Sequence, residues 1–532
     1  MKKKILTSVL AVSMLISSYT TAFAADDVIS ATQIGSQAAT VTYKDASTFN
    51  VTIPKSIHIG SDKIGTYEVK VTGELNDGDV LNVVPSKTVE MTDAEGKASV
   101  TAKVGQKKTD FEKEDLADGA EVTTTGTVRS DELSAGAWTG NLSFDIGIET
   151  LGTIGADVKL TSSNRDTYGI AKTGDVVIPK WVQDSDGTYH KVTSIDSFLF
   201  SNYSNSSTTV TSVVIPDSVT YIGSYAFNQT WISELTLPDS VIKIDQGAFE
   251  GCTRLRNGLT LSDNLEYIGK YAFRNIRVSS LELPNSLKYI GEDAFASGMY
   301  LESVVIPKNV ETIVNNPFNG SKNIKSISVD PENKIFTSEG INGIIEKDTK
   351  RLVALVIEDD GIVDWDRSKV EKLSSNFITN IIDHSNPIDA VDLTGLKGEI
   401  CDKAFYSVEM KGNLVIPEGI TSIGKEAFWM SYSSKDNPEA LTVSLPSTLI
   451  SIGDEAFRGC ENMTNINLPD ELQSIGDNAF SSTYGLKGTL TIPDSVTSIG
   501  KNAFQYTSSN LHLKYNGSAT GAPWGCDNAV NK

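Results

Sequence analysis

A short motif, Ile followed five residues later by Phe, recurs eleven times in this chain of 532 residues, mostly as Ile-Gly-x-x-Ala-Phe. Its phenylalanines are Phe200, Phe227, Phe249, Phe273, Phe295, Phe318, Phe405, Phe428, Phe457, Phe480 and Phe504. Apart from one jump from Phe318 to Phe405, neighbouring phenylalanines lie 22 to 29 residues apart, and mostly 22 to 24. A unit of this length cannot bury its own apolar face, so neighbouring units must stack. The pattern therefore predicts a solenoid.

Each repeat combines a short strand with a turn. In the repeat that ends at Phe227, Val213 and Ile215 alternate with outward-facing Ser212 and Val214, as in a half-buried strand. Proline then closes the strand where no ladder N–H is needed. The same Ile/Leu-Pro step recurs at Pro179, Pro238, Pro284, Pro307, Pro417, Pro446, Pro469 and Pro493. The repeated Ile, Leu and Phe side chains are therefore predicted to form the core.

The glycine after the repeated Ile is replaced at four places. Asp196 and Asp245 occupy the position in two repeats. Gly and Asp both tolerate a left-handed backbone, so we expect a left-handed turn there. Val314 and Cys401 occupy it in the two repeats that flank the long gap. The regular coil is expected to deform at those two repeats.

These residues resemble a known family. Leu-Pro-Asp-Ser-Val followed by Ile and Ala-Phe, with Gly251-Cys252 and Gly459-Cys460 after the Phe, resembles the BspA-like leucine-rich repeats of bacterial surface and secreted proteins. The segment 178–193 and the closing Gly-Ala-Pro-Trp-Gly at 521–525 are similar to the first and last coils of that family. The resemblance covers about 155–532. It implies a leucine-rich repeat solenoid of about 22–24-residue repeats and extracellular binding, often adhesion, without catalytic residues.

The long gap predicts an insertion at about 319–395. Gly343-Ile344-Ile345 and the apolar run 352–355 indicate a hairpin that turns at 348–350, and Trp365, Leu373 and Phe377 suggest one degenerate coil. Similar hairpin insertions occur in the family that the repeats resemble. Insertions in solenoids collect on one face and are often functional. The alternative is a tolerated decoration of the edge.

The residues before the repeats have a different pattern. Residues 25–150 alternate apolar and polar residues between Gly-, Asp- and Ser-bearing breaks, which predicts a β-sandwich domain ahead of the solenoid at 151–532. The segment 134–140 resembles N-terminal modules of secreted Gram-positive proteins. A basic start, an apolar stretch from Ile5 to Ser18 and Ala22-Phe23-Ala24 predict a Sec-type signal peptide over 1–24. We therefore expect an extracellular protein, secreted or associated with the cell surface, and no membrane span.

Charge and residue types argue against several kinds of chemistry. The 46 Lys+Arg against 68 Asp+Glu give a net charge of −22, which argues against a protein that binds the phosphates of nucleic acids. Cys252 and Cys460 share one repeat position many coils apart and so cannot pair, and with Cys401 and Cys526 they are expected to be isolated thiols; the four His show no metal-ligand spacing. The segment Asp184-Ser185-Asp186-Gly187 faintly resembles a calcium loop, but a hairpin turn accounts for it better. We expect no enzyme, no catalytic residue, no metal and no cofactor.

Binding is therefore expected on the exposed strand positions. The residue before each Ile/Leu-Pro step should point outward. These nine residues, called the exposed ladder, are Val214, Thr236, Thr260, Glu282, Val305, Val415, Ser444, Asn467 and Thr491. They are small, often β-branched and almost uncharged, and they include no aromatic row for stacking sugars. Such a surface suits a protein partner, or it only keeps the sheet soluble.

Two functions fit this organisation. The first is protein–protein recognition or adhesion to an extracellular protein or other cell-surface ligand. The second is a structural role as a spacer associated with the cell wall, attached non-covalently through the N-terminal domain. The two differ in which part of the chain should bind.

Overall fold

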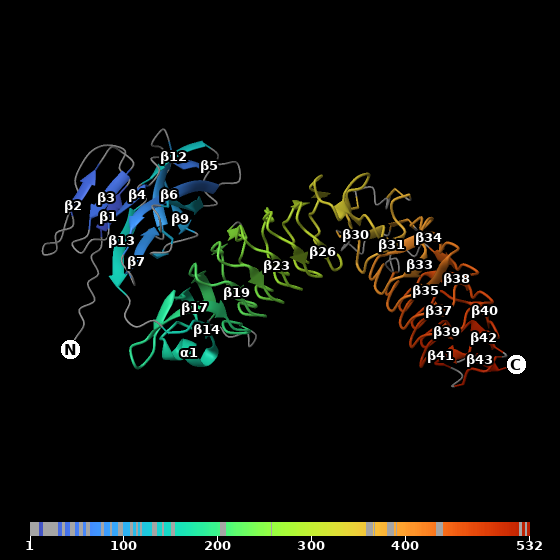
Figure 1. Cartoon of the computed structure of the whole chain (residues 1–532). Coiled ribbons are helices and arrows are strands. Elements are labelled where there is room, and N and C mark those ends of the chain that lie inside the picture. Colours follow the sequence, from blue (N-terminus) through green and yellow to red (C-terminus); the bar gives the residue numbers. More distant parts are fainter. Residues whose placement is uncertain are drawn as a thin grey trace. The chain divides into compact units, whose positions relative to one another are not determined.

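The computed structural model describes residues 155–531 except 203–208, 257, 358–364, 367, 380–387, 390, 432–439, 516, 521–523 and 527–528. Before residue 155 it describes thirteen strands and residues 75, 115–116 and 120–121. The chain divides into two compact units, Met1–Leu265 and Glu266–Lys532, whose elements are labelled in Figure 1. The described part is mainly β, with a single short helix.

The first unit begins with antiparallel sheets. One sheet has four strands in the order β1 (Leu10–Ser13), β13 (Ser143–Thr150), β7 (Asp79–Pro85) and β10 (Asp110–Glu112). The other has the order β11 (Val122–Arg129), β9 (Ser99–Gln106), β8 (Thr88–Asp93), β12 (Gly136–Gly140), β5 (Ile57–Ile59), β6 (Ile64–Glu74), β4 (Thr48–Thr52), β3 (Ala38–Thr42) and β2 (Ser30–Gln33). Because β11 also pairs with β6, six of these strands form a closed ring. The sandwich packing and the domain boundary at 150 remain predictions.

Of the predicted signal peptide only Leu10–Ser13 lies within the described residues, as strand β1. The peptide itself therefore also remains a prediction.

The rest of the first unit is built of parallel coils. The elements in chain order are β14 (Val158–Leu160), α1 (Ser162–Thr167), β15 (Gly174–Val177), β16 (Trp181–Gln183), β17 (Tyr189–Ile195), β18 (Val210–Val214), β19 (Tyr221–Ile222), β20 (Leu235–Thr236), β21 (Lys243–Ile244) and β22 (Leu259–Thr260). The order β14-β17-β19-β21 forms one row, and β15 pairs with β18 and β20 with β22 in another.

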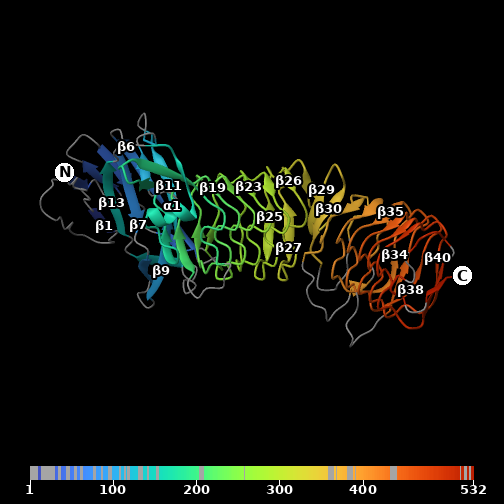
Figure 2. The same ribbon diagram turned by 90° about the horizontal axis from the view of Figure 1, so that it is seen from below.

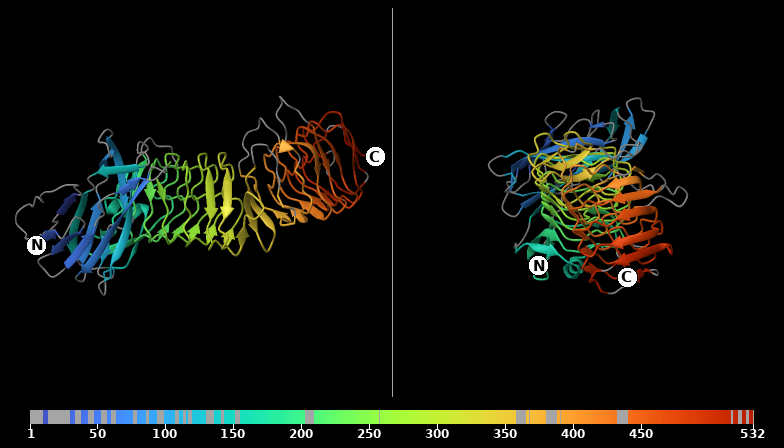
Figure 3. Two further views of the ribbon diagram at one scale, coloured as in Figure 1. Left: turned by 90° about the horizontal axis from the view of Figure 1, so that it is seen from above. Right: turned by 90° about the vertical axis from the view of Figure 1, so that its right-hand side faces the viewer.

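The second unit is also built largely of parallel coils. Its first coils contain β23 (Tyr267–Ile268), β24 (Tyr289–Ile290), β25 (Ser303–Ile306), β26 (Thr312–Ile313) and β27 (Ser326–Val329), and β25 and β27 run side by side in Figure 2. Its last coils contain β32 (Ile388–Asp389), β33 (Gly398–Ile400), β34 (Met410–Val415), β35 (Ile420–Ile423), β36 (Leu441–Ser444), β37 (Ser451–Ile452), β38 (Met463–Asn467), β39 (Ser474–Ile475), β40 (Gly488–Ile492), β41 (Ser498–Ile499), β42 (Leu511–Tyr515) and β43 (Ala529–Asn531). In Figure 3 (right) the orange and red strands lie one above another.

Between these groups the chain forms an antiparallel hairpin. Strands β28 (Phe336–Thr337), β29 (Gly343–Glu346) and β30 (Arg351–Leu355) pair antiparallel, and β29 and β30 are joined by a turn over 347–350. After the hairpin the parallel pairing resumes: β30 pairs in parallel with β31 (Lys372–Leu373). Trp365 and Phe377 are buried beside it, as expected for a degenerate coil.

The repeated phenylalanines form the core, as the sequence predicts. All eleven are buried, none more than 4% exposed. Rings of neighbouring coils stack face to face, for example 5.2 Å between the centroids of Phe227 and Phe249 and 5.1 Å between Phe428 and Phe457. The backbone fixes this spacing, since the N–H of Phe428 donates to the carbonyl of Ala456 at 2.8 Å.

The stack changes direction at the degenerate coil. The ring of Phe377 stands edge-on to Phe405, with an interplanar angle of 87°. The pairing of β33 with β35 also shifts register between Gly398 and Glu399. The coil therefore deforms next to Cys401, as the sequence indicates.

The expectation of a left-handed turn at the repeated glycine is wrong. Gly223 and its counterparts are not among the residues with positive φ, and neither are Asp196 and Asp245. Left-handed residues instead lie two positions before the Phe, such as Tyr225 with φ 56° and Glu455 with φ 55°, and two positions after it, such as Gln229 with φ 57°. Gly223 is needed for another reason. A Cβ there would lie 2.7 Å from the backbone nitrogen of Ser197, in the preceding coil.

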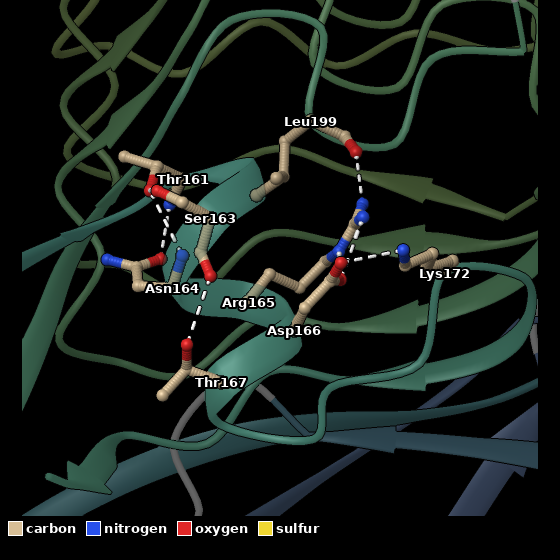
Figure 4. Close-up of polar contacts among 8 residues, drawn as sticks. All are labelled: Thr161, Ser163, Asn164, Arg165, Asp166, Thr167, Lys172 and Leu199. Carbon is tan, nitrogen blue, oxygen red and sulfur yellow. Dashed lines mark hydrogen bonds and ion pairs between the residues drawn. The ribbon is translucent and has the colours of Figure 1, made fainter.

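A capped helix begins the solenoid (Figure 4). The Thr161 hydroxyl accepts a hydrogen bond from the N–H of Asn164, and the Asn164 side chain accepts one from the N–H of Thr161, which forms a capping box. The guanidinium of Arg165 donates to the carbonyl of Leu199 at 2.7 Å and pairs with Asp166. The Arg165 hydrogen bond therefore joins the helix to the coil that contains Leu199.

Candidate functional site

The strands place the exposed ladder on the outside of the coils. In β18, Val213 is 8% exposed and the next residue, Val214, is 49% exposed. The same alternation puts Val304 inside and Val305 outside. Of the nine ladder residues, Thr236 and Thr260 are half-buried, and the other seven are exposed. Glu282 lies outside the described strands. The sequence prediction of outward-facing residues therefore holds.

Strand register lines up ladder residues on neighbouring coils. In the first unit Thr236 lies opposite Thr260. In the second unit Val415 lies opposite Ser444, and Ser444 lies opposite Asn467. Because these strands are parallel and in register, the paired ladder side chains form rows. Within a row, neighbouring side chains lie about 4.8 Å apart, the spacing between adjacent strands.

Three residues missed from the sequence continue the ladder. Val177 lies opposite Val214 and is 54% exposed. Ser328 lies opposite Val305, and Lys514 lies opposite Thr491. Val177 could have been found, because it precedes the Ile178-Pro179 step. Ser328 and Lys514 precede no such proline, so the motif did not mark them.

A second row lies beside the ladder in the second unit. Two residues before Val415, Ser444, Asn467 and Thr491 are Asn413, Thr442, Asn465 and Thr489. The Thr442 hydroxyl donates to the Asn413 side-chain oxygen at 2.9 Å across the strands. Asn413, Asn465 and Thr489 are exposed. The face is thus almost uncharged, with hydroxyl, amide and methyl groups and the charged ladder residues Glu282 and Lys514, although the chain carries a net charge of −22.

The inserted hairpin is held firmly to its neighbours. The Arg351 guanidinium donates to the carbonyls of Ile313 and Val314 at 2.9 and 2.7 Å and to the Ser374 hydroxyl at 3.0 Å. The buried Asn333 side chain donates to the Pro307 carbonyl at 2.8 Å. These bonds fix the hairpin as a packed element of the second unit.

The segment Asp184–Gly187 is a hairpin turn between β16 and β17. The Asp184 carboxylate accepts a hydrogen bond from the N–H of Thr188 and pairs with the imidazole of His190 at 2.9 Å. This bond to Asp184 and one to the Ala156 carbonyl raise the pKa of His190. The acidic side chains therefore serve the turn, and the hairpin-turn interpretation holds.

The cysteines do not form a reactive centre. All four are free thiols; Cys252, Cys460 and Cys526 are buried and Cys401 is half-buried. Burial raises the pKa of Cys252, Cys401 and Cys460 to about 12, which leaves little thiolate at neutral pH.

No group of three His, Cys, Asp or Glu residues that could hold a metal ion occurs among the described residues. Within that same part of the chain, no helix is both long and apolar enough to span a membrane.

Comparisons with solved structures find bacterial leucine-rich repeat proteins. The pneumococcal vaccine antigen PcpA is 21% identical, with 71% of this chain and 86% of that chain covered and a TM-score of 0.47. A leucine-rich cell surface protein from Faecalibacterium prausnitzii is 21% identical, with 67% and 87% covered and a TM-score of 0.40. A leucine-rich repeat protein from Eubacterium ventriosum is 20% identical, with 63% and 89% covered and a TM-score of 0.43.

A search of curated protein sequences finds no match. A family model for the BspA type leucine-rich repeat region matches six copies, over 188–297, 220–342 and 431–522. These matches cover nine of the eleven repeats whose Ile and Phe side chains form the stacked core; the repeats that end at Phe405 and Phe428 lie outside them. Residues 188–342 and 431–522 of this chain thus belong to the BspA-type leucine-rich repeat family.

Proposed function

We propose that this chain is a non-enzymatic bacterial protein, secreted or held at the cell surface, that recognises an extracellular protein through its exposed ladder. Adhesion to another cell or to matrix is the role that this recognition would serve. Export by the predicted signal peptide over 1–24 is part of the proposal.

The in-register, almost uncharged ladder face is the observation that carries this proposal. The centres of protein interfaces are depleted of charged residues, because charge is costly to remove from water. A flat face of Val, Thr, Ser and Asn in a chain of net charge −22 therefore supports protein binding. The face has no aromatic row, which argues against a platform for sugar rings.

Lysine substitutions on the ladder test the proposal. The full chain carrying Thr236→Lys, Asn467→Lys and Thr491→Lys is compared with the unchanged chain for binding to immobilised matrix proteins and mucin. A buried lysine without a partner is costly, so we expect binding to weaken by about tenfold or more. A matched control carries Thr312→Lys, Gln473→Lys and Thr497→Lys, which add the same charge at exposed positions outside the ladder. Equal losses in both variants would show that the ladder is not the site.

A second function, a wall-associated spacer, is favoured by one observation. A buried ion cluster joins Glu112 of the N-terminal sheets to Lys180 and Asp217 of the coils, with both Lys180 contacts at 2.9 Å. Such a junction would transmit force from an attached N-terminal region. Binding of the full chain to purified Gram-positive cell wall, retained by the ladder variant, would support the spacer.

A further inference from the structure

Two arginines of the first unit differ from its other cations. Between residues 155 and 265 the sequence contains twelve Asp+Glu and eight Lys+Arg. Five of the cations hold ion pairs, namely Lys159, Arg165, Lys172, Lys180 and Lys191. Lys243 lies over the ring of Tyr221, 5.5 Å from the centroid. Arg254 and Arg256 are exposed, and neither has a carboxylate partner in the described part of the chain.

Between residues 155 and 265, the residues outside the described part of the chain carry no charge that could pair with these two arginines. They are 203–208 and 257, whose sequence contains only Tyr, Ser, Asn and Thr. Local ion pairing therefore does not account for these two exposed arginines, two residues apart in the sequence of an acidic protein.

An aromatic ring orders one of the two arginines. The guanidinium carbon of Arg254 lies 4.0 Å from the ring centroid of Trp231, which is half-buried. Leu255, between the two arginines, is fully buried and fixes the backbone there. A stacked guanidinium keeps its N–H donors in a fixed fork that matches both oxygens of a carboxylate.

The patch lies where the ladder strands of the first unit begin. The N–H of Trp231 donates to the carbonyl of Val210, the first residue of β18, at 2.9 Å. Arg256 lies three residues before Leu259, the first residue of β22, and β22 carries the ladder residue Thr260. The arginines therefore border the proposed binding face.

We infer that Trp231, Arg254 and Arg256 anchor an acidic segment of a partner protein at the edge of the exposed ladder. This inference rests on the proposed function and names the chemistry of its partner. Trp and Arg are the residues most often found in the energetic centres of protein interfaces. An anionic glycan is less favoured, because Arg254 already occupies a face of the Trp231 ring on which a sugar would stack.

A fluorescein-labelled peptide of about ten glutamates is the probe, and its binding to the full chain is followed by fluorescence anisotropy at about 50 mM NaCl, where screening is weak. The variant Arg254→Gln/Arg256→Gln should bind about tenfold more weakly or worse. The variant Arg254→Lys/Arg256→Lys should lose most of this affinity too, because lysine keeps the charge without the fork or the stacking. The control Lys308→Gln/Lys325→Gln removes two exposed lysines that are paired with Glu332 and Glu302, and it should bind within about twofold of the unchanged chain.

Several results would overturn the inference. They are absence of peptide binding to the unchanged chain, equal loss in the control, or full retention by the lysine variant. Binding of a heparin fragment in place of the peptide would assign the patch to anionic glycans and would overturn it as well. If the peptide fails but the ladder variant still loses binding to a panel protein, the inference fails and the proposed function stands. If the peptide binds at the arginines and the ladder variant loses nothing, the patch stands and the ladder site fails.

Discussion

Between coils of the second unit, an aspartate reaches across the repeated glycine to the next coil. Asp454 Oδ1 accepts a hydrogen bond from the N–H of Asp477 at 2.8 Å, and Asp477 Oδ1 accepts one from the N–H of Lys501 at 2.6 Å. A Cβ on Gly476 would lie 2.4 Å from the nitrogen of Asp454 and 2.6 Å from its Oδ1. Glycine is therefore needed for the close approach of two coils, and each aspartate uses that approach to join them.

Substitutions at these two residues should separate steric from polar effects. Gly476→Ala should lower the free energy of unfolding by about 1–3 kcal/mol or more, because the two nearest atoms that its Cβ meets are backbone atoms of Gly453 and Asp454. Asp454→Ala should cost about 1 kcal/mol, the usual net value of one hydrogen bond. Chemical denaturation followed by circular dichroism measures both, with Asp470→Ala at an exposed turn as the control. A cost for Gly476→Ala no larger than that of the control would refute the close-contact explanation.

At this scale the sequence predicts burial better than conformation. The interior position of Phe227 follows from its period, since a recurring apolar residue must face the shared core. The left-handed backbone at Tyr225 could not be predicted, because tyrosine has no preference for positive φ. The repeated glycine misled for a related reason. A glycine can be required either for a left-handed backbone or for the close approach of another segment. The sequence is the same in both cases, so only the structure shows which reason applies.

Among the elements, the inserted hairpin depends on one side chain. Arg351 of β30 bonds main-chain carbonyls of Ile313 and Val314 and pairs with Glu346 at 3.1 Å. Arg351→Met should leave those carbonyls and the carboxylate without their donor and cost about 2–3 kcal/mol. Hydrogen exchange of the hairpin amides and the thermal midpoint report the loss. Lys334→Met, at an exposed residue nearby, is the control. Unchanged exchange in the Arg351 variant would mean that apolar packing alone holds the hairpin.

The sequence predicts the hairpin but not this anchor. Two apolar runs separated by Asp348-Thr349-Lys350 carry a local signal for a turn. Arg351, in contrast, donates to main-chain carbonyls 37 and 38 residues earlier in the chain. Every residue type has a main-chain carbonyl, so no residue pattern marks these partners in the sequence. The ladder residues likewise can be predicted only where a local sequence motif accompanies them. Val305 was marked by the proline that follows two residues later, and Ser328 was not.

At the scale of the whole molecule, the ion cluster joins the N-terminal sheets of the first unit to its coils. Lys180 lies between Glu112 of β10 and Asp217, and its side chain is only 7% exposed. Burial raises the pKa of Glu112, but Lys180 and Lys191 outweigh it and lower the pKa overall. Burial lowers the pKa of Lys180, but Asp217 and Glu112 outweigh it and raise the pKa overall. The charges are thus compensated, and removing one leaves the others buried without a partner.

The pH dependence of stability follows from the directions of these shifts. A lowered pKa at Glu112 contributes stability above its ordinary value of 4.5, and this contribution is lost as the pH falls through the folded value. A raised pKa at Lys180 contributes stability below 10.5, and this is lost as the pH rises through the folded value. The junction should therefore be most stable between these two ordinary values and should weaken in acid.

The substitution Lys180→Met tests this account because it keeps the length of the side chain and removes the charge. At neutral pH it should cost about 3–5 kcal/mol, since it breaks a buried ion pair, and calorimetry of the full chain should show a lower midpoint for the first unit. In acid, once the pH has fallen through the folded pKa of Glu112, its carboxyl becomes protonated and no longer needs a cation, so the difference from the unchanged chain should shrink. Lys308→Met, whose exposed lysine pairs with Glu332, should change the midpoint at neither pH. A Lys180→Met difference of the same size at both pH values would mean that packing of the lysine stem, and not its charge, holds the junction together.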